Sequence, residues 1–323
     1  MAYSMIGLSF IWLILIFIAS LALLIAASNA FTFAAEKIGI FLGMPSFIIG
    51  VTIVAFGTSL PELISSIFAV VKDSSEIVVG NVIGSNITNI FLVLGITAII
   101  GKKIKLKFKI GYVDLSLLVG SALLFSLMVS DGVFGLSEAI FSIFGIIIYV
   151  LYAANASKPK IKAKKKQLAA LEPRKMEIKP WFYLLLSGVA IYFSALYTVE
   201  SIVVIAEKIK IGKEIIAASA VALGTSLPEL VVSIIAAVKN KPEIAIGNIL
   251  GSNIFNTFAV MGIPGLIGNL ALPDNMIAFG VPMMVIASVL FFLVTQQRRV
   301  TNWEGWLLLI FYTFFLGKLF NLV

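Results

Sequence analysis

Two residue types that often build functional sites are missing from this 323-residue chain. It contains no cysteine and no histidine. The first absence excludes disulfides, thiol catalysis and thiolate metal sites, and the second removes the commonest metal ligand. Any cation site must therefore be built from oxygen, which suits hard ions such as Ca²⁺, Na⁺ or Mg²⁺.

Charged residues are also scarce, at 12% of the chain, whereas hydrophobic residues make up 60%. Apolar runs of about 18 residues or more, long enough to cross a bilayer, occur throughout. The first run, from Met5 to about Ala27, is too long for the apolar part of a signal peptide. We predict an all-α polytopic membrane protein whose ten transmembrane helices lie at about 5–28, 47–71, 77–101, 110–129, 133–156, 181–206, 214–238, 243–268, 275–296 and 302–322.

The net charge of +8 is explained by where the basic residues lie. With the N-terminus outside, 19 of the 24 Lys and Arg fall in inside connections. The positive-inside rule then places both termini outside the cell membrane and the basic segment 157–179 in the cytoplasm. The charge therefore indicates membrane orientation and contact with lipid headgroups, and no nucleic-acid partner is expected.

An internal repeat divides the chain. Residues 51–101 align with residues 218–268 at a constant offset of 167, without a gap, and 29 of the 51 positions are identical. Each half holds five predicted spans, and an odd number forces the second half to enter the membrane from the opposite side. We predict two inverted five-helix halves, 1–156 and 180–323, joined by a short basic linker at 157–179.

The most unusual residues recur in both copies. The six residues Gly-Thr-Ser-Leu-Pro-Glu occupy 57–62 and again 224–229. Proline disrupts a helix and a carboxylate is costly at membrane depth, so each copy predicts a break with a function. A second pair of segments, 80–89 and 247–256, is rich in Gly, Ser and Asn and is predicted to be broken as well. Close helix packing explains the small residues, but it has no use for Glu62 or Glu229.

Neither glutamate has a basic partner in its own or a neighbouring span. Two carboxylates that meet near the bilayer centre repel each other unless a cation arrives. The proline breaks are expected to expose backbone carbonyls, and the second segments add neutral side-chain oxygens, which together make the six to eight hard ligands that Ca²⁺ prefers. The oxygens come from residues around Ala55, Thr58, Ala222 and Thr225 and from Ser85, Ser252, Asn89 and Asn256. Glu36 is expected to be interfacial, and Glu200 to be a buried hydrogen-bonded group, with a secondary polar site as the alternative.

These doubled motifs resemble the two α-repeats of the calcium/cation antiporter superfamily, in its prokaryotic sodium/calcium exchanger branch. The resemblance implies exchange of Na⁺ for Ca²⁺ by alternating access, with no cofactor and no enzymatic activity. It implies that Glu62 and Glu229 bind Ca²⁺ and then Na⁺, and that Thr58 and Thr225 offer backbone oxygens to Ca²⁺. The flanking Na⁺ sites would be completed by Ala55, Ser59, Ser85, Ala222, Ser226 and Ser252, and the centre lined by Asn89 and Asn256.

Two departures narrow this expectation, and two alternatives stay open. Relatives coupled to K⁺ carry Asp where Asn89 or Asn256 stands, so K⁺-independent exchange is expected here. The linker is too short for the calcium-sensing domains of animal exchangers.

A proton/calcium antiporter using the same two glutamates is the alternative function, and a cation channel is a remoter one. Nothing indicates an oligomer, and a monomer is compatible with the sequence.

Overall fold

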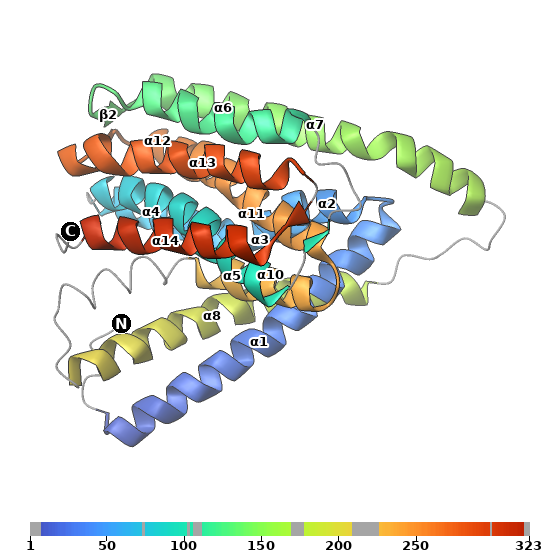
Figure 1. Cartoon of the computed structure of the whole chain (residues 1–323), viewed down its shortest axis with the longest axis horizontal. Helices are drawn as coiled ribbons and strands as arrows, with labels where there is room; N and C mark the ends of the chain where they lie inside the picture. The colour runs from blue at the N-terminus through green and yellow to red at the C-terminus, as the bar shows by residue number, and fades with distance from the viewer. Residues whose placement is uncertain are drawn as a thin grey trace.

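The fold is a bundle of long helices with two very short β-ladders (Figure 1). This computed structural model describes residues 8–72, 75–101, 104–105, 112–168, 178–208, 226–297 and 299–319. The first half contains α1 (Phe10–Phe41), α2 (Ser46–Ile49), η2 (Gly50–Val54), α3 (Ala55–Val71), α4 (Ser75–Thr88), η3 (Asn89–Leu94), α5 (Gly95–Ile100), β1 (Ile104–Lys105), α6 (Tyr112–Met128), β2 (Val133–Phe134) and α7 (Leu136–Leu168).

The second half repeats this order. It contains α8 (Lys179–Lys208), α10 (Leu227–Val238), α11 (Pro242–Phe255), η4 (Asn256–Val260), α12 (Met261–Gly265), β3 (Leu270–Ala271), η5 (Met276–Gly280), α13 (Val281–Thr295), β4 (Arg299–Val300) and α14 (Asn302–Leu319). The elements labelled η are π-helical, which means that their turns are wider than those of an α-helix.

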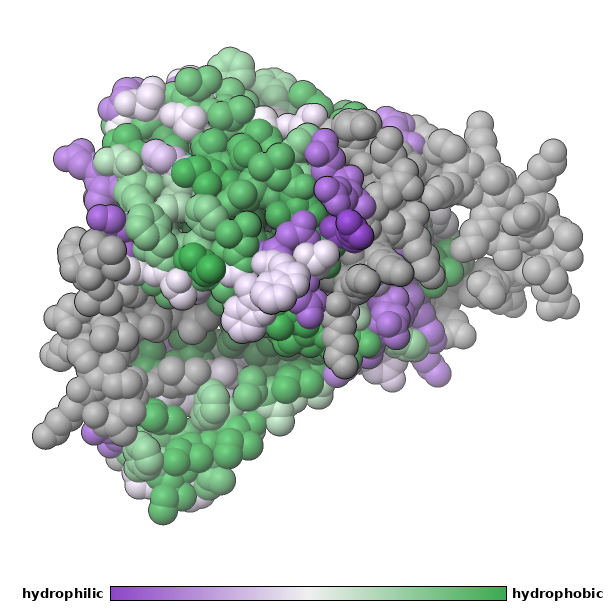
Figure 2. Space-filling view, in the orientation of Figure 1, coloured by the Kyte–Doolittle hydropathy of each residue, from purple (hydrophilic) through white to green (hydrophobic). Residues whose placement is uncertain are grey.

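Each of the ten predicted spans corresponds to a helical segment. Seven segments are long and apolar enough to cross a membrane, and shorter apolar helices occupy 113–128 and 227–238. The tenth is α14. On the face shown in Figure 2, the described helices are largely hydrophobic, as lipid contact requires. In Figure 1, α1 begins and α14 ends on the same side of the bundle, in agreement with an even number of spans.

Two boundaries differ from the prediction. Helix α1 continues to Phe41 instead of ending near residue 28, because residues 29–38 contain neither Gly nor Pro; Gly43, with a φ of 74°, follows its end. Helix α7 continues to Leu168, so the first half of the segment 157–179 is helical. Its Lys, Ala and Gln residues are strong helix formers, and they extend a helix that the fifth span has already started.

The breaks predicted at Pro61 and in the two second segments are wrong in form. Pro61 lies inside α3, which continues to Val71, and the irregularity lies upstream in the π-helical η2. The second segments are also continuous, with a π-helical turn that starts at Asn89 in one copy and at Asn256 in the other. A π-turn absorbs a local irregularity without ending the helix, and such turns occur frequently at functional sites.

The two halves exchange packing partners. Helix α14, the last span of the second half, packs on η3 and α5, whereas α7, the last span of the first half, packs on η4 and α12. The ladders follow the same rule: Ile104 pairs with Val300 and Val133 pairs with Ala271. At the repeat offset of 167, residue 271 corresponds to residue 104, and residue 300 corresponds to residue 133. Each ladder therefore joins the first strand of one half to the second strand of the other half. This is a pseudo-twofold arrangement, in which neither half encloses its own core.

Glycine allows the closest approach between the halves. A Cβ added to Gly247 would clash with the carbonyl oxygen of Phe47, and one added to Gly251 would clash with that of Val51. These contacts pack α11 directly against the backbone of η2. The approach places the start of α3 beside α11, where the polar residues of both repeats meet.

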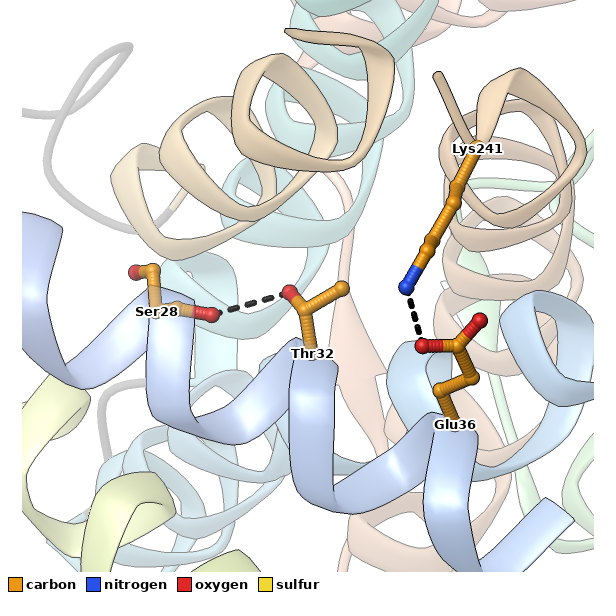
Figure 3. A network of polar contacts seen from close by, with 4 residues as sticks. All are labelled: Ser28, Thr32, Glu36 and Lys241. Carbon is orange, nitrogen blue, oxygen red and sulfur yellow. Dashed lines mark hydrogen bonds and ion pairs between the residues drawn. The ribbon is translucent and has the colours of Figure 1, made fainter. Parts of the chain in front are cut away.

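Helices α1 and α8 form a separate pair along one side of the bundle (Figure 1). Thr198 of α8 donates a hydrogen bond to Ser20 of α1 at 2.9 Å. At the other end of α1, Glu36 forms an ion pair with Lys241, which precedes α11 (Figure 3). The two long helices are therefore tied to each other, and one end of the pair is tied to the core.

Candidate cation site

The two repeated motifs meet at the centre of the bundle. Glu62 projects from α3 and Glu229 from α10, and their side chains are 1% and 0% exposed. Ser59, one turn before Glu62, donates a hydrogen bond from its hydroxyl to Oε1 of Glu229 at 3.2 Å. One carboxylate from each half therefore contributes to the same buried region, as the sequence predicts.

These carboxylates lack the partners that buried anions need. Neither Glu62 oxygen accepts a hydrogen bond from the described residues, and the same holds for Oε2 of Glu229. Within the described ranges the one ion pair is that of Lys241 with Glu36, outside this region. A buried, unpaired carboxylate is strongly destabilising, so the region is built for a positively charged occupant.

Thr58 brings further oxygens to the same place. Its hydroxyl lies 3.3 Å from the carbonyl oxygen of Ala55 and 3.4 Å from the hydroxyl of Ser252 in α11. It also donates to Oδ1 of Asn248 at 3.1 Å. Pro61 has no N–H, so the carbonyl of Gly57 receives no helical hydrogen bond from it. Thr58, Ala55 and Ser252 thus lie together across the boundary between the halves.

The two asparagines expected to line the centre of the site also have side chains without hydrogen-bond partners among the described residues. Asn89 and Asn256 are buried, and the described residues contact none of their amide atoms by a hydrogen bond. Each is the first residue of a π-helical turn, η3 or η4. Ser85 is buried one turn earlier and donates to Asn81 at 3.5 Å.

Some expected site residues cannot be placed. Ala222 and Thr225 lie outside the described residues. Ser226, at the start of α10, is described and buried, and its hydroxyl has no hydrogen-bond partner among the described residues. Glu200 is only partly buried, in contrast to the expectation for it.

Sequence reasoning missed two residues that touch this network. Asn248 bonds to Thr58 and also donates to the hydroxyl of Ser233 at 3.0 Å. Both are identical in the other repeat, as Asn81 and Ser66, at the same offset as the glutamates. Their duplication was a signal that could have identified them.

The donor set fits a hard cation. It combines two carboxylates with hydroxyl, amide and backbone oxygens, and in the described part of the chain no cluster of three or more acidic residues exists elsewhere. Such oxygen-only sets suit Ca²⁺ and Na⁺. Ions bound here between two inverted halves would be cargo of the protein, because a site at the interface of inverted repeats is typical of secondary transporters.

The fold and the site together define a membrane antiporter of the cation/Ca²⁺ class. The family profile described as sodium/calcium exchanger protein matches residues 12–157 and 179–320. The chain therefore belongs to the sodium/calcium exchanger family, whose members are transporters of Ca²⁺ and Na⁺ that need no cofactor and are not enzymes.

Individual relatives agree with this assignment. The chain is 32% identical to the sodium/calcium exchanger MaX1 of Methanosarcina acetivorans, over 95% of this chain and 98% of that protein. It is 31% identical to the inner membrane protein YrbG of Escherichia coli K12, over 89% and 90% of the two chains. A solved structure of the sodium-calcium exchanger NCX_Mj superposes with a TM-score of 0.80 at 28% identity and covers 95% of this chain and 98% of its own. The similarity covers both inverted halves of the fold.

Proposed function

We propose that this protein exchanges Na⁺ for Ca²⁺ across the cell membrane by alternating access, without K⁺. The observation that carries the proposal is the pair of buried carboxylates, one from each half, of which three oxygens out of four accept no hydrogen bond from the described residues. Their two negative charges balance one Ca²⁺ or two Na⁺. The two ions therefore compete for the same carboxylates, which couples the exit of one to the entry of the other.

The proposed roles follow the positions of the residues. Glu62 and Glu229 bind Ca²⁺ together with the backbone oxygens of Thr58 and Thr225. The Na⁺ sites that flank them use the carboxylates with oxygens of Ala55, Ser59, Ser85, Ala222, Ser226 and Ser252. Asn89 and Asn256 line the centre, and because both are neutral amides they support exchange that needs no third cation such as K⁺.

The proposed orientation places both termini outside the cell and the linker 157–179 in the cytoplasm. Residues 1–156 and 180–323 act as the inverted halves around the site. The α1–α8 pair, which lies against one side of the bundle and contacts it less extensively than its helices contact each other, is the element that moves to expose the site to either side. The names of MaX1 and NCX_Mj support sodium as the coupling ion.

The test is calcium flux in proteoliposomes with the Na⁺, K⁺ and pH gradients varied one at a time. Uptake of Ca²⁺ driven by an outward Na⁺ gradient, and unchanged by K⁺, is expected. Glu62→Gln and Glu229→Gln should each abolish uptake while leaving a folded protein, whereas Asp274→Asn, at an exposed acidic residue, should transport normally. Flux that follows the pH gradient and ignores Na⁺ would establish proton/calcium exchange instead, and an ionic conductance in planar bilayers would establish a channel.

A further inference from the structure

Asn248 connects three helices through one buried amide. Its side chain is 0% exposed, on α11. Oδ1 accepts the hydrogen bond from Thr58 of α3, and Nδ2 donates to Ser233 of α10. The amide therefore bridges the first half to the second directly beside the carboxylates, although it is not itself among the expected ligands.

This bridge fixes the direction of a proton. The Asn248 amide oxygen can only accept, and at 3.1 Å it is the nearer acceptor, so we assign the single hydroxyl proton of Thr58 to this contact. The same hydroxyl lies 3.3 Å from the carbonyl of Ala55, which is the competing acceptor. Because the Thr58 hydroxyl donates to Asn248, the Ala55 carbonyl keeps its lone pairs for a cation.

The direction of the Thr58 proton also determines that of the Ser252 hydroxyl proton. Its hydroxyl lies 3.4 Å from that of Thr58, and either oxygen could donate. With the Thr58 proton directed to Asn248, Ser252 is the donor in this contact, and its proton points away from the ions. The lone pairs of Ser252 are then available to a cation. Ser233 maintains this arrangement of protons, because its hydroxyl oxygen accepts the hydrogen bond from Nδ2 of Asn248. This bond prevents the amide from exchanging the positions of its oxygen and nitrogen.

We propose that Asn248 is a positioning residue of the cation site. By ordering the hydroxyl protons of Thr58 and Ser252, it leaves the Ser252 hydroxyl oxygen and the Ala55 carbonyl oxygen directed as acceptors toward bound cations. The inference rests on the proposed cation site, but it does not depend on which gradient drives transport.

Two substitutions separate this role from simple packing. Asn248→Asp keeps an acceptor for Thr58, and the Ser233 hydroxyl can rotate to donate to the second oxygen. Asn248→Leu keeps the branched shape at Cγ but accepts nothing. If the residue only filled space, Leu would be tolerated and a buried Asp would be harmful. The proposal requires the opposite result: the Asp variant should keep its ion affinity, and the Leu variant should lose it.

The experiment measures Ca²⁺ affinity of the purified full-length protein in detergent by equilibrium titration without Na⁺, and Na⁺ affinity by displacement of Ca²⁺. Asn248→Leu should weaken both affinities about tenfold, the cost of a lost ordering hydrogen bond. Asn248→Asp should bind Ca²⁺ at least as tightly as the unaltered protein. Ser288→Ala is the matched control for removing a buried hydroxyl, because that hydroxyl bonds only to Met284 of its own helix.

Wild-type affinity in Asn248→Leu, or equal loss in the Leu and Asp variants, would overturn the proposal. If the Leu variant fails to fold, Ser233→Ala decides, since it releases the amide without touching Thr58. That variant should lose affinity about threefold, and unchanged binding would refute the positioning role. A protein that binds Ca²⁺ but does not exchange it for Na⁺ would contradict the proposed function and leave this inference intact.

Discussion

At the scale of single residues, the two glutamates are equivalent in sequence but not in surroundings. Glu229 accepts a hydrogen bond from Ser59, whereas Glu62 accepts none from the described residues. The corresponding hydroxyl, that of Ser226, has no hydrogen-bond partner in the same part of the chain. Among the described residues, one carboxylate thus has a protein donor and the other has none.

This asymmetry predicts a selective effect of Ser59→Ala. The substitution removes an oxygen proposed for a Na⁺ site but none proposed for Ca²⁺, so Na⁺ affinity should fall about fivefold while Ca²⁺ affinity changes less than about twofold. The measurement is the Na⁺ concentration that displaces half of the bound Ca²⁺.

Ser65→Ala is the control on the same helix, because the Ser65 hydroxyl bonds only to the backbone of Glu62. Equal losses of Na⁺ and Ca²⁺ affinity in Ser59→Ala would contradict the assignment of Ser59 to a Na⁺ site.

The sequence predicted much of this region because the signal was doubled. Glu62, Glu229, Thr58 and Ser59 stand out as polar residues in apolar runs, and the structure brings them together. The contact of Thr58 with Asn248 could not be predicted, since it depends on how α3 and α11 are set against each other. That register is decided by close glycine contacts between segments almost 200 residues apart in the chain.

At the scale of elements, the end of α1 is held by a polar strip. Ser28, Thr32 and Glu36 follow one another at a spacing of four residues, and Figure 3 shows Glu36 meeting Lys241. Thr32 donates to the Ser28 carbonyl at 2.8 Å within the helix, whereas Glu36 makes its contact outside α1, with Lys241. If α1 moves during transport, this ion pair is the contact that has to open on that face.

We therefore expect Lys241→Gln to loosen this end of α1. Ala35, buried beside Glu36, provides a reporter, because the chain has no cysteine and a single Ala35→Cys can be labelled alone. Labelling by a small thiol reagent should be about threefold faster in the Lys241→Gln background, since a partly exposed ion pair contributes up to ~1 kcal/mol. Lys239→Gln, at an exposed lysine two residues earlier, is the control. An unchanged labelling rate would show that the pair does not hold the helix.

Element boundaries were the weakest part of the sequence prediction. The irregular turns were placed at Pro61 and in the glycine-rich segments, yet they occur as π-helical turns at η2, η3 and η4. A proline marks where a donor is missing, but the neighbouring turns decide how the backbone adapts, and that depends on packing. The helical start of the linker was missed because its lysines were taken as a sign of a solvated connector.

At the scale of the whole molecule, the inverted arrangement followed from an odd number of spans per repeat. The exchange of partners between the halves did not, because it is set by contacts between distant segments. It predicts that neither half makes a site alone. Residues 1–168 and 169–323 expressed separately should not bind Ca²⁺, and co-expression should restore a complex that copurifies and binds Ca²⁺ within about threefold of the intact chain. Binding of wild-type affinity by one half would contradict this expectation.

The exchanged packing also has a consequence for the order of synthesis. The backbones of Gly95 and Gly305 approach so closely that an added Cβ on either would crowd the carbonyl oxygen of the other. The third span thus receives its final neighbour from α14, which is synthesised long after it. Until α14 has been synthesised, η3, which begins at Asn89, lacks the helix that packs against it. We therefore expect that a nascent chain cannot bind an ion at this site before α14 has been inserted.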